Sequence, residues 1–199
     1  MTATFLLIRH AMHADYGRRF TGRADGVLLS TEGKAQAQAL GGRLAGSDLA
    51  AVYSSPRERC RATAEAVAVP HRLFVQQNER LDEIDLGDWT GREIDSLNGD
   101  PAFDRWNTER GTAAPPNGEA FASVADRAFG LAQTLASQHV GETIALVSHQ
   151  DVIKALVATC LFLPLDHVLR FDIGPASVTR LVMGGWGAKL LTLNEYAAA

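Results

Sequence analysis

A short apolar run near the N-terminus ends abruptly in two polar residues. Residues 4–8 read TFLLI and are followed directly by Arg9 and His10. An uninterrupted run of this length is typical of a strand that is buried on both faces, as in a parallel sheet covered by helices. The sequence therefore predicts an α/β fold, with Arg9 and His10 at the carboxyl end of its first strand.

The rest of the chain alternates short apolar runs with longer amphipathic segments. A polar, glycine-containing loop leads to about residue 30, where Ser30 and Glu32 precede a helical pattern that continues to Leu44. Further strands are expected at 50–55, 72–75, 143–148, 168–173, 177–183 and 188–193, and helices at 57–68, from 119 and at about 151–161. This order predicts a three-layer, doubly wound α/β fold with a mostly parallel sheet, an antiparallel edge and helices on both faces.

The periodicity weakens between residues 81 and 118, where glycine and proline interrupt short helical pieces. Long segments of this kind in compact domains usually serve as lids or binding segments. The chain has 199 residues, enough for one substantial core, and shows no repeat or interdomain linker. We therefore expect one domain over residues 1–199, with an excursion over the active site at about 81–118.

The composition limits the partners of the chain. A formal net charge of −4 gives no global attraction to nucleic acid or to an anionic membrane. No stretch approaches the roughly 18 apolar residues of a membrane span, and the first residues carry no basic leader. Cys60 and Cys160 have neither pairing nor metal-ligand spacing, so free thiols are expected. These features predict a cytoplasmic protein with no nucleic-acid, membrane or metal partner.

Histidine recurs at a second strand end. His149 follows the apolar run 143–148 and precedes a helical pattern. Because ligands of doubly wound folds bind outside the carboxyl ends of the strands, Arg9, His10 and His149 are expected to approach one another. The remaining histidines have no such context, and we expect them to be structural or exposed.

Five ordered segments together indicate a family. LLI followed by Arg9 and His10, SSPRERCRATAE (54–65), LDEIDLGDWTG (81–91), PPNGE (115–119) and VSHQDVIKAL (147–156) resemble the histidine phosphatase superfamily, the phosphoglycerate mutase-like family. The resemblance covers most of the chain in the expected order. It implies a phosphoglycerate mutase-like fold and phosphoryl transfer.

The resemblance also implies roles for five residues. His10 would be the nucleophile that forms a phosphohistidine, and Arg9 and Arg59 would clamp the phosphoryl oxygens. His149 would hydrogen-bond the transferred group, and Glu83 would protonate the leaving oxygen and then activate water. That acid role requires burial to raise the carboxyl pKa against the lowering effect of nearby arginines, which the sequence leaves open. Two neighbouring carboxylates, Asp82 and Asp85, remain alternatives.

Further residues resemble the substrate-binding segments of the family. Thr21, Gly22 and Arg23 in FTGRAD match a segment near the phosphate, and Arg23 is a candidate reader of substrate charge. Gln150 stands in place of a usual glycine and still offers its backbone amide at a helix start. Glu119 matches a residue near the pocket, with a helix N-terminal cap as an equal interpretation.

Several positions depart from the family pattern. Ala11 replaces the usual glycine after the nucleophile, and Tyr16 stands where an asparagine often touches phosphate. His13 is either an extra pocket donor or, as we expect, an exposed loop residue. Arg57 and Arg61 share one helix face, which we expect to be solvated. These departures leave the substrate open.

We therefore expect a metal-independent phosphatase with no cofactor, acting on a small phosphorylated metabolite through a phosphohistidine on His10. A phosphoglycerate mutase-type transfer and, less favoured, a non-catalytic phosphate-binding protein are the alternatives. The oligomeric state is not determined by the sequence.

Overall fold

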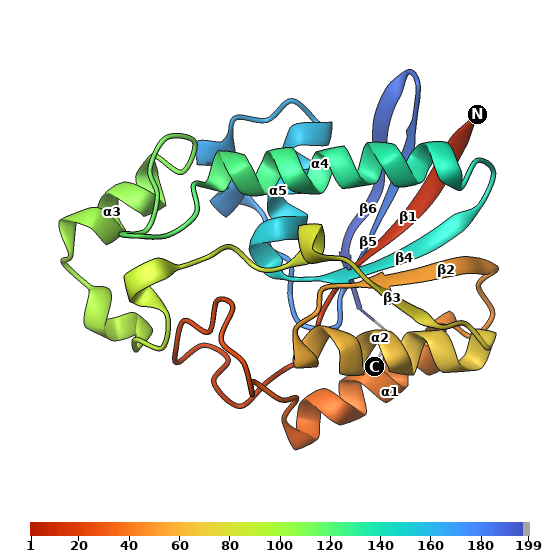
Figure 1. Ribbon diagram of the computed structural model, residues 1–199, viewed down its shortest axis with the longest axis horizontal. Helices are drawn as coiled ribbons and strands as arrows, with labels where there is room; N and C mark the ends of the chain where they lie inside the picture. Colours follow the sequence, from red (N-terminus) through yellow and green to blue (C-terminus); the bar gives the residue numbers. More distant parts are fainter. Residues whose placement is uncertain (197–199) are drawn as a thin grey trace.

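The fold is built on one mixed sheet, shown in Figure 1. The computed structural model describes residues 1–196. Over these residues six strands pair in the order β3-β2-β4-β1-β5-β6. The strands are β1 (Thr2–Arg9), β2 (Leu49–Ser54), β3 (Val75–Gln77), β4 (Thr143–Ser148), β5 (Val178–Gly184) and β6 (Gly187–Glu195).

The sheet is parallel on one side of β1 and antiparallel on the other. β4 runs parallel to β1, and β2 and β3 continue the parallel part. β5 is antiparallel to β1, and β6 is antiparallel to β5. The predicted mostly parallel sheet with an antiparallel edge is therefore confirmed.

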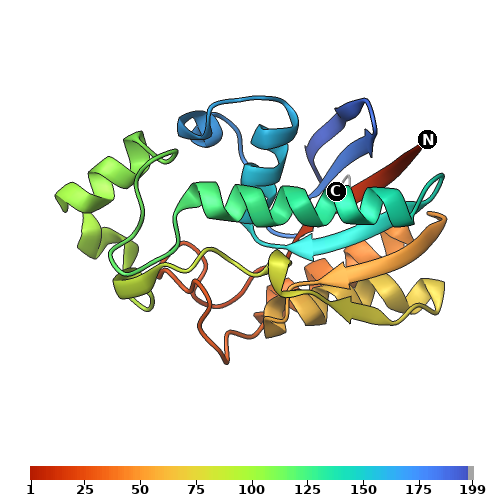
Figure 2. The ribbon, with the colours of Figure 1, turned by 45° about the horizontal axis from the view of Figure 1, so that its top comes forward.

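Helices cover both faces of the sheet, as Figures 1 and 2 show. In β1, Phe5 and Leu7 pack into one core, while Leu6 and Ile8 pack into the other. Alternate residues of a strand point to opposite faces, so a strand covered on both sides must be apolar throughout, as TFLLI is. One face carries α1 (Thr31–Leu44) and α2 (Glu58–Ala68), and the other carries α4 (Phe121–Gln138) and α5 (Gln150–Cys160).

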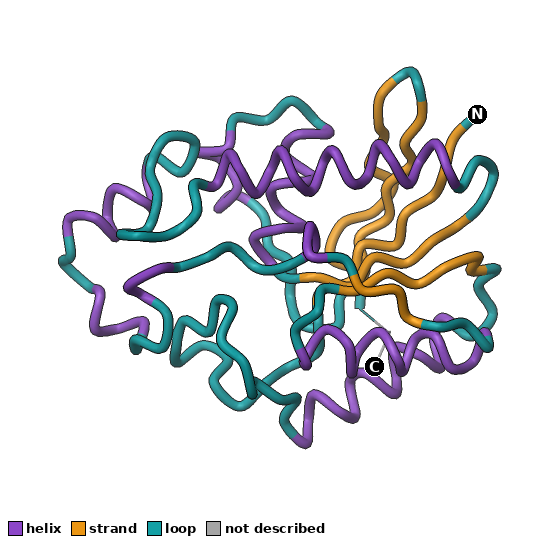
Figure 3. Tube along the Cα trace, viewed as in Figure 1, coloured by secondary structure: helices purple, strands orange, loops and turns teal. Residues whose placement is uncertain are grey.

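The segment between β3 and α4 extends beyond the sheet and contains mostly short helices. Phe20, Trp89, Phe103 and Trp106 form an aromatic cluster that ties this segment to the loop after β1, with ring centroids 5.4 to 6.5 Å apart. Figure 3 shows both segments beside the strand ends, mostly as loops and short helical turns. The helical pieces are η2 (Glu79–Leu81), η3 (Gly87–Trp89), η4 (Ile94–Leu97) and α3 (Pro101–Thr108).

Two predicted strands need correction. Residues 168–173 are not a strand: residues 168–170 end a 3₁₀ helix, η5 (Leu165–Arg170), that buries Val168 in the core shared with α5, and residues 171–173 are irregular. Both sides of β1 are already paired with β4 and β5, so no inner edge of the sheet is open to this segment. The strand predicted at 72–75 begins only at Val75, because Arg72 adopts a left-handed conformation with φ of 58° after a short 3₁₀ turn, η1 (Val69–His71).

Candidate active site

A cavity of about 290 Å³ lies at the carboxyl ends of the parallel strands. Its walls come from the end of β1, the loop that follows β1, the segment between β3 and α4, and the start of α5. Six of the nine residues expected at the site line it directly: Arg9, His10, Thr21, Gly22, Glu83 and Gln150. Arg59 and His149 are buried behind this wall, and Arg23 lies outside it.

His10 is held with one ring nitrogen turned to the backbone. Its amide donates to the Ser148 carbonyl at 2.9 Å, which joins the ends of β1 and β4. Its ring Nδ1 lies 2.8 Å from the Ala11 carbonyl oxygen, which can only accept a hydrogen bond. Nδ1 therefore carries the proton, and the lone pair of a neutral ring is left on Nε2.

The surroundings keep the His10 ring neutral. Burial, followed by the positive charges of Arg59 and Arg9, lowers the pKa of His10 well below its usual value of 6.5. The same three effects, together with His10 itself, lower the pKa of His149. Both rings are thus uncharged at neutral pH. For His10, the neutral state is the one that has a lone pair for nucleophilic attack.

Arg9 is fixed at the cavity wall by neighbouring acceptors. Its Nη1 donates to the Gln150 side-chain oxygen and to the Ile173 carbonyl, each at 2.6 Å. Its guanidinium also lies 5.2 Å from the ring centre of Tyr16. Gln150 is the first residue of α5, so its side chain orients Arg9 while its backbone amide belongs to the free helix N-terminus.

Arg59 approaches the site from the first turn of α2. Its Nη2 donates to the Gly22 carbonyl at 2.6 Å and lies 3.1 Å from His149 Nδ1. Its Nε and Nη1 are buried with no hydrogen-bond partner among residues 1–196. Buried donors without partners are rare in folded proteins, and beside a cavity they are suited to hold an anion.

The structure separates Glu83 from the two alternative carboxylates. Asp82 is buried, and its carboxylate accepts hydrogen bonds from the Ser55 hydroxyl and the Glu83 amide. It also forms an ion pair with Arg57, whose Nη2 lies 3.0 Å from Asp82 Oδ2. Asp85 accepts from the Gly87 amide and does not line the cavity. Of the three, only Glu83 faces the cavity. We expected Arg57 to lie on a solvated helix face, and this was wrong: the Arg57 side chain is mostly buried and holds Asp82 in an ion pair.

Burial decides the protonation state of Glu83, which the sequence left open. Burial, followed by the negative charge of Asp151, raises the pKa of Glu83 from 4.5 to about 8. The Ile84 amide and the charges of Arg59 and Arg9 lower it by less. Glu83 is therefore protonated at neutral pH, as a proton donor to a leaving group requires. Its Oε2 lies 3.7 Å from His149 Nδ1, and with both groups uncharged this contact is not an ion pair.

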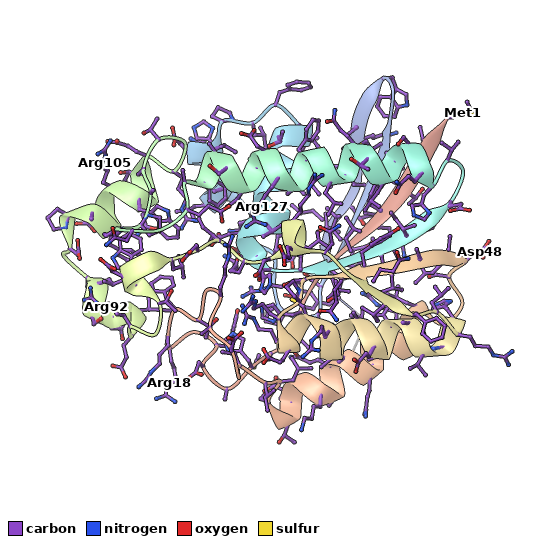
Figure 4. The ribbon with its side chains drawn as sticks, in the orientation of Figure 1. Met1, Arg18, Asp48, Arg92, Arg105 and Arg127 are labelled. Carbon is purple, nitrogen blue, oxygen red and sulfur yellow. The ribbon has the colours of Figure 1, made fainter. Side chains whose placement is uncertain are left out.

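Arg23 supports Glu83 from outside the cavity. Its Nε donates to the Glu83 carbonyl at 2.7 Å, and its Nη2 pairs with Glu119 at 2.8 Å. Arg127 of α4 binds the same two partners, and Figure 4 shows it near the segment that carries them. Glu119 is not the helix cap, since α4 begins after Ala120 without a side-chain cap.

Residues 5–196 of the chain match the model of the histidine phosphatase superfamily, branch 1. The chain belongs to the histidine phosphatase superfamily. Phosphoserine phosphatase 1 of Hydrogenobacter thermophilus is 31% identical over 194 residues, 95% of this chain and 90% of that protein. The adenosylcobalamin/alpha-ribazole phosphatase of Escherichia coli is 29% identical over 194 residues, 96% of this chain and 95% of that protein. The solved structure of YhfR from Bacillus stearothermophilus matches with a TM-score of 0.91 at 35% identity, covering 98% of both chains.

Eight residues that line the cavity of this histidine phosphatase were not among the nine expected at the site, and four of the eight carry polar side chains: His13, Tyr16, Arg19 and Asp151. Tyr16 and Asp151 line the cavity, and so does His13, which we expected to be exposed but is 6% exposed. The available signal was position: His13 and Tyr16 closely follow the nucleophile, and Asp151 closely follows His149. Over residues 1–196, no helix is long and apolar enough to cross a bilayer, and no cluster of three or more His, Cys, Asp or Glu side chains could hold a metal ion.

Replacement of Asp151 by asparagine should change the pH profile of this histidine phosphatase. The protonated form of Glu83 is lost as the pH rises through about 8, so the alkaline limb of kcat/KM should lie there in the wild type. Without the Asp151 charge, and with its partner Arg110 left unpaired, ionised Glu83 is stabilised and the limb should move to lower pH. Asp172→Asn, which removes an exposed carboxylate paired with Lys154, is the matched control. A limb that stays in place in Asp151→Asn would contradict this assignment.

Proposed function

We propose that the protein is a metal-independent phosphatase that hydrolyses a small phosphorylated metabolite through a phosphohistidine on His10. The observation that carries the proposal is the presence of two groups in one cavity, each in the protonation state that it needs. His10 is neutral, with a lone pair on Nε2, and Glu83 is a protonated acid. The phosphatase names of the two relatives support hydrolysis as the outcome.

In the first half of the reaction, His10 Nε2 attacks phosphorus and forms an N–P bond. The P–O ester bond breaks, and its electron pair stays on the leaving oxygen, which takes the proton of Glu83. The dephosphorylated product then leaves. Glu83 is left as a carboxylate beside the phosphohistidine, where it can accept a proton from water.

In the second half, the Glu83 carboxylate takes that proton as the water oxygen attacks phosphorus. The N–P bond breaks, its electron pair returns to Nε2, and inorganic phosphate leaves. Both His10 and Glu83 are restored to their starting states. The two halves therefore need no redox partner and consume only the ester and one water.

Charge at the phosphoryl group is balanced by groups that are already in place. We assign the unpartnered buried donors of Arg59 and the guanidinium of Arg9 to the phosphoryl oxygens. His149 lies behind the cavity wall next to Arg59, and its ring is neutral. The segment Thr21–Gly22 and the Gln150 amide complete the substrate contacts. Arg23, whose guanidinium is engaged outside the cavity, acts on the substrate through Glu83.

The size of the cavity supports a small substrate. A volume of about 290 Å³ lies just below the usual range for small-molecule pockets, roughly 300–1,000 Å³. We propose a cytoplasmic location on the basis of the two free cysteines, Cys60 and Cys160, which are both buried.

A product analysis tests the proposal against its alternatives. The protein is incubated with phosphoglycerates, sugar phosphates, phospho-amino acids and nucleotides, and both released phosphate and isomerised phosphoglycerate are measured. We expect released phosphate to exceed isomerised product for at least one substrate. Isomerisation without net release would favour a mutase. Binding of phosphate analogues without turnover or phosphohistidine would favour a binding protein.

A further inference from the structure

His13 lies next to the nucleophile on a segment that is firmly held. Its backbone pairs with Leu29 in an isolated antiparallel bridge, and the carbonyl of the preceding Met12 accepts from the Ser30 amide at 3.0 Å. The His13 ring centre is 5.5 Å from that of His10 and 6.4 Å from that of Tyr16. The ring is therefore positioned by the fold and does not move with an exposed loop.

The ring has no hydrogen-bond partner within the described chain. Nδ1 is buried and unpaired among residues 1–196, and Nε2 forms no hydrogen bond within this range. The side chain nevertheless lines the cavity. Because Nδ1 is enclosed, Nε2 is the nitrogen through which His13 reaches the cavity. Buried polar groups are normally satisfied, so an unpaired ring beside a substrate cavity indicates that a ligand completes it.

The chemistry of the ring suits an anionic ligand. Burial, then the charges of Arg59 and Arg9, lowers the pKa of His13 to about 4, while Asp15 acts in the opposite direction. The ring is therefore neutral at physiological pH and has a single N–H. With that proton on Nε2, His13 offers a donor to the cavity without adding a positive charge to the two arginines. Nonbridging phosphoryl oxygens are acceptors only, and they fit this donor.

We propose that His13 is a further catalytic residue of this enzyme, donating its Nε2–H to a nonbridging oxygen of the phosphoryl group that passes to and from His10. The assignment rests on the proposed phosphatase function. A donor at this place would bind most strongly when negative charge builds up on the oxygens during transfer.

The test compares two substitutions of His13. His13→Leu replaces the ring with an apolar side chain of similar bulk and so removes the donor, whereas His13→Gln places an amide near the position of Nε2. We expect His13→Leu to lower kcat/KM for an aryl phosphate by on the order of 10²-fold and to weaken binding of vanadate, a mimic of the five-coordinate phosphoryl group, in parallel. In His13→Gln, both kcat/KM and the affinity for vanadate should be at least about tenfold higher than in His13→Leu. His71→Leu is the control: His71 follows the end of α2 that is remote from Arg59, so kcat/KM and vanadate binding should be those of the wild type.

The shape of the pH profile separates this role from proton transfer. Since His13 titrates near pH 4, its donor is present throughout pH 5–9, and the loss in His13→Leu should be the same at every pH in that range. A loss confined to one limb of the profile would overturn the assignment. Equal losses in His13→Leu and His13→Gln would also overturn it, because they would indicate packing alone.

A measurement on the wild type avoids any effect of the substitutions on folding. In ¹⁵N-histidine spectra, the Nε2–H resonance of His13, identified by its loss in His13→Gln, should move downfield when vanadate is added. No movement at saturating vanadate would overturn the proposal. If His13→Leu keeps full activity while His10→Ala loses it, the inference about His13 fails and the phosphatase function stands. If no phosphohistidine forms in the wild type, the phosphatase function itself fails.

Discussion

Replacing His10 with alanine is expected to lower kcat/KM for an aryl phosphate by about 10⁴-fold or more, because alanine has no nitrogen with which to form the covalent intermediate. The Nε2 lone pair of His10 is presented by a fixed hydrogen bond from Nδ1 to the Ala11 carbonyl, and the ring is kept neutral by burial beside two arginines. Alanine removes the nucleophile while the arginines remain. Vanadate should therefore still bind, although turnover is lost.

The covalent intermediate gives a second readout for His10. Wild-type protein quenched during turnover should carry an acid-labile phosphoryl group, and His10→Ala should carry none. Cleavage after Arg9 and Arg18 gives a peptide that contains both His10 and His13, so the modified histidine must be located by fragment ions. A phosphoryl group on His13 in the wild type would contradict the assignment of the nucleophile.

His71→Ala is the matched control for this substitution. His71 follows the far end of α2, whose first turn carries Arg59, and it takes no part in the cavity. Its kcat/KM should stay within about twofold of the wild type, as is usual for changes away from a site. Thermal unfolding of both variants shows whether the fold is kept. Full activity in a folded His10→Ala would refute the proposed mechanism.

Replacing Glu83 with glutamine is expected to have an effect that depends on the leaving group. For an alkyl phosphate, whose leaving oxygen must be protonated as the bond breaks, kcat/KM should fall by about 10²–10⁴-fold. For an aryl phosphate with an acidic phenol, the leaving oxygen is stable without a proton, so the fall in kcat/KM should be much smaller. The alkaline limb near pH 8 should disappear, because glutamine does not ionise in this range.

The second half of the reaction gives an independent test of Glu83. Hydrolysis of the phosphohistidine is common to all substrates and uses the Glu83 carboxylate as a base. With the aryl phosphate, Glu83→Gln should therefore accumulate phosphohistidine and show a burst of phenol before slow turnover. Glu79→Gln, a change at an exposed position four residues earlier, is the control. Equal losses in kcat/KM on alkyl and aryl substrates would contradict a role in protonating the leaving group.

Much of the fold could be predicted because its pattern is local. TFLLI alternates between two cores, and any strand covered on both faces must be apolar in this way. The same reasoning failed for residues 168–173, where a short apolar pattern became η5. Short apolar runs are compatible with strands and with helical turns, and only the available sheet edges decide between them.

The sequence by itself determined the layered α/β fold and, through its family motifs, the candidates His10, Arg9, Arg59, Glu83 and His149. The order of the strands brought these residues to one end of the sheet, and that could be anticipated because strand ends converge in such folds. Only the tertiary structure decided the protonation of Glu83, the placement of His13 in the cavity and the engagement of Arg57 with Asp82. Burial and Coulomb interactions depend on which distant segments surround a group, and these distances are set by the fold and not by sequence spacing.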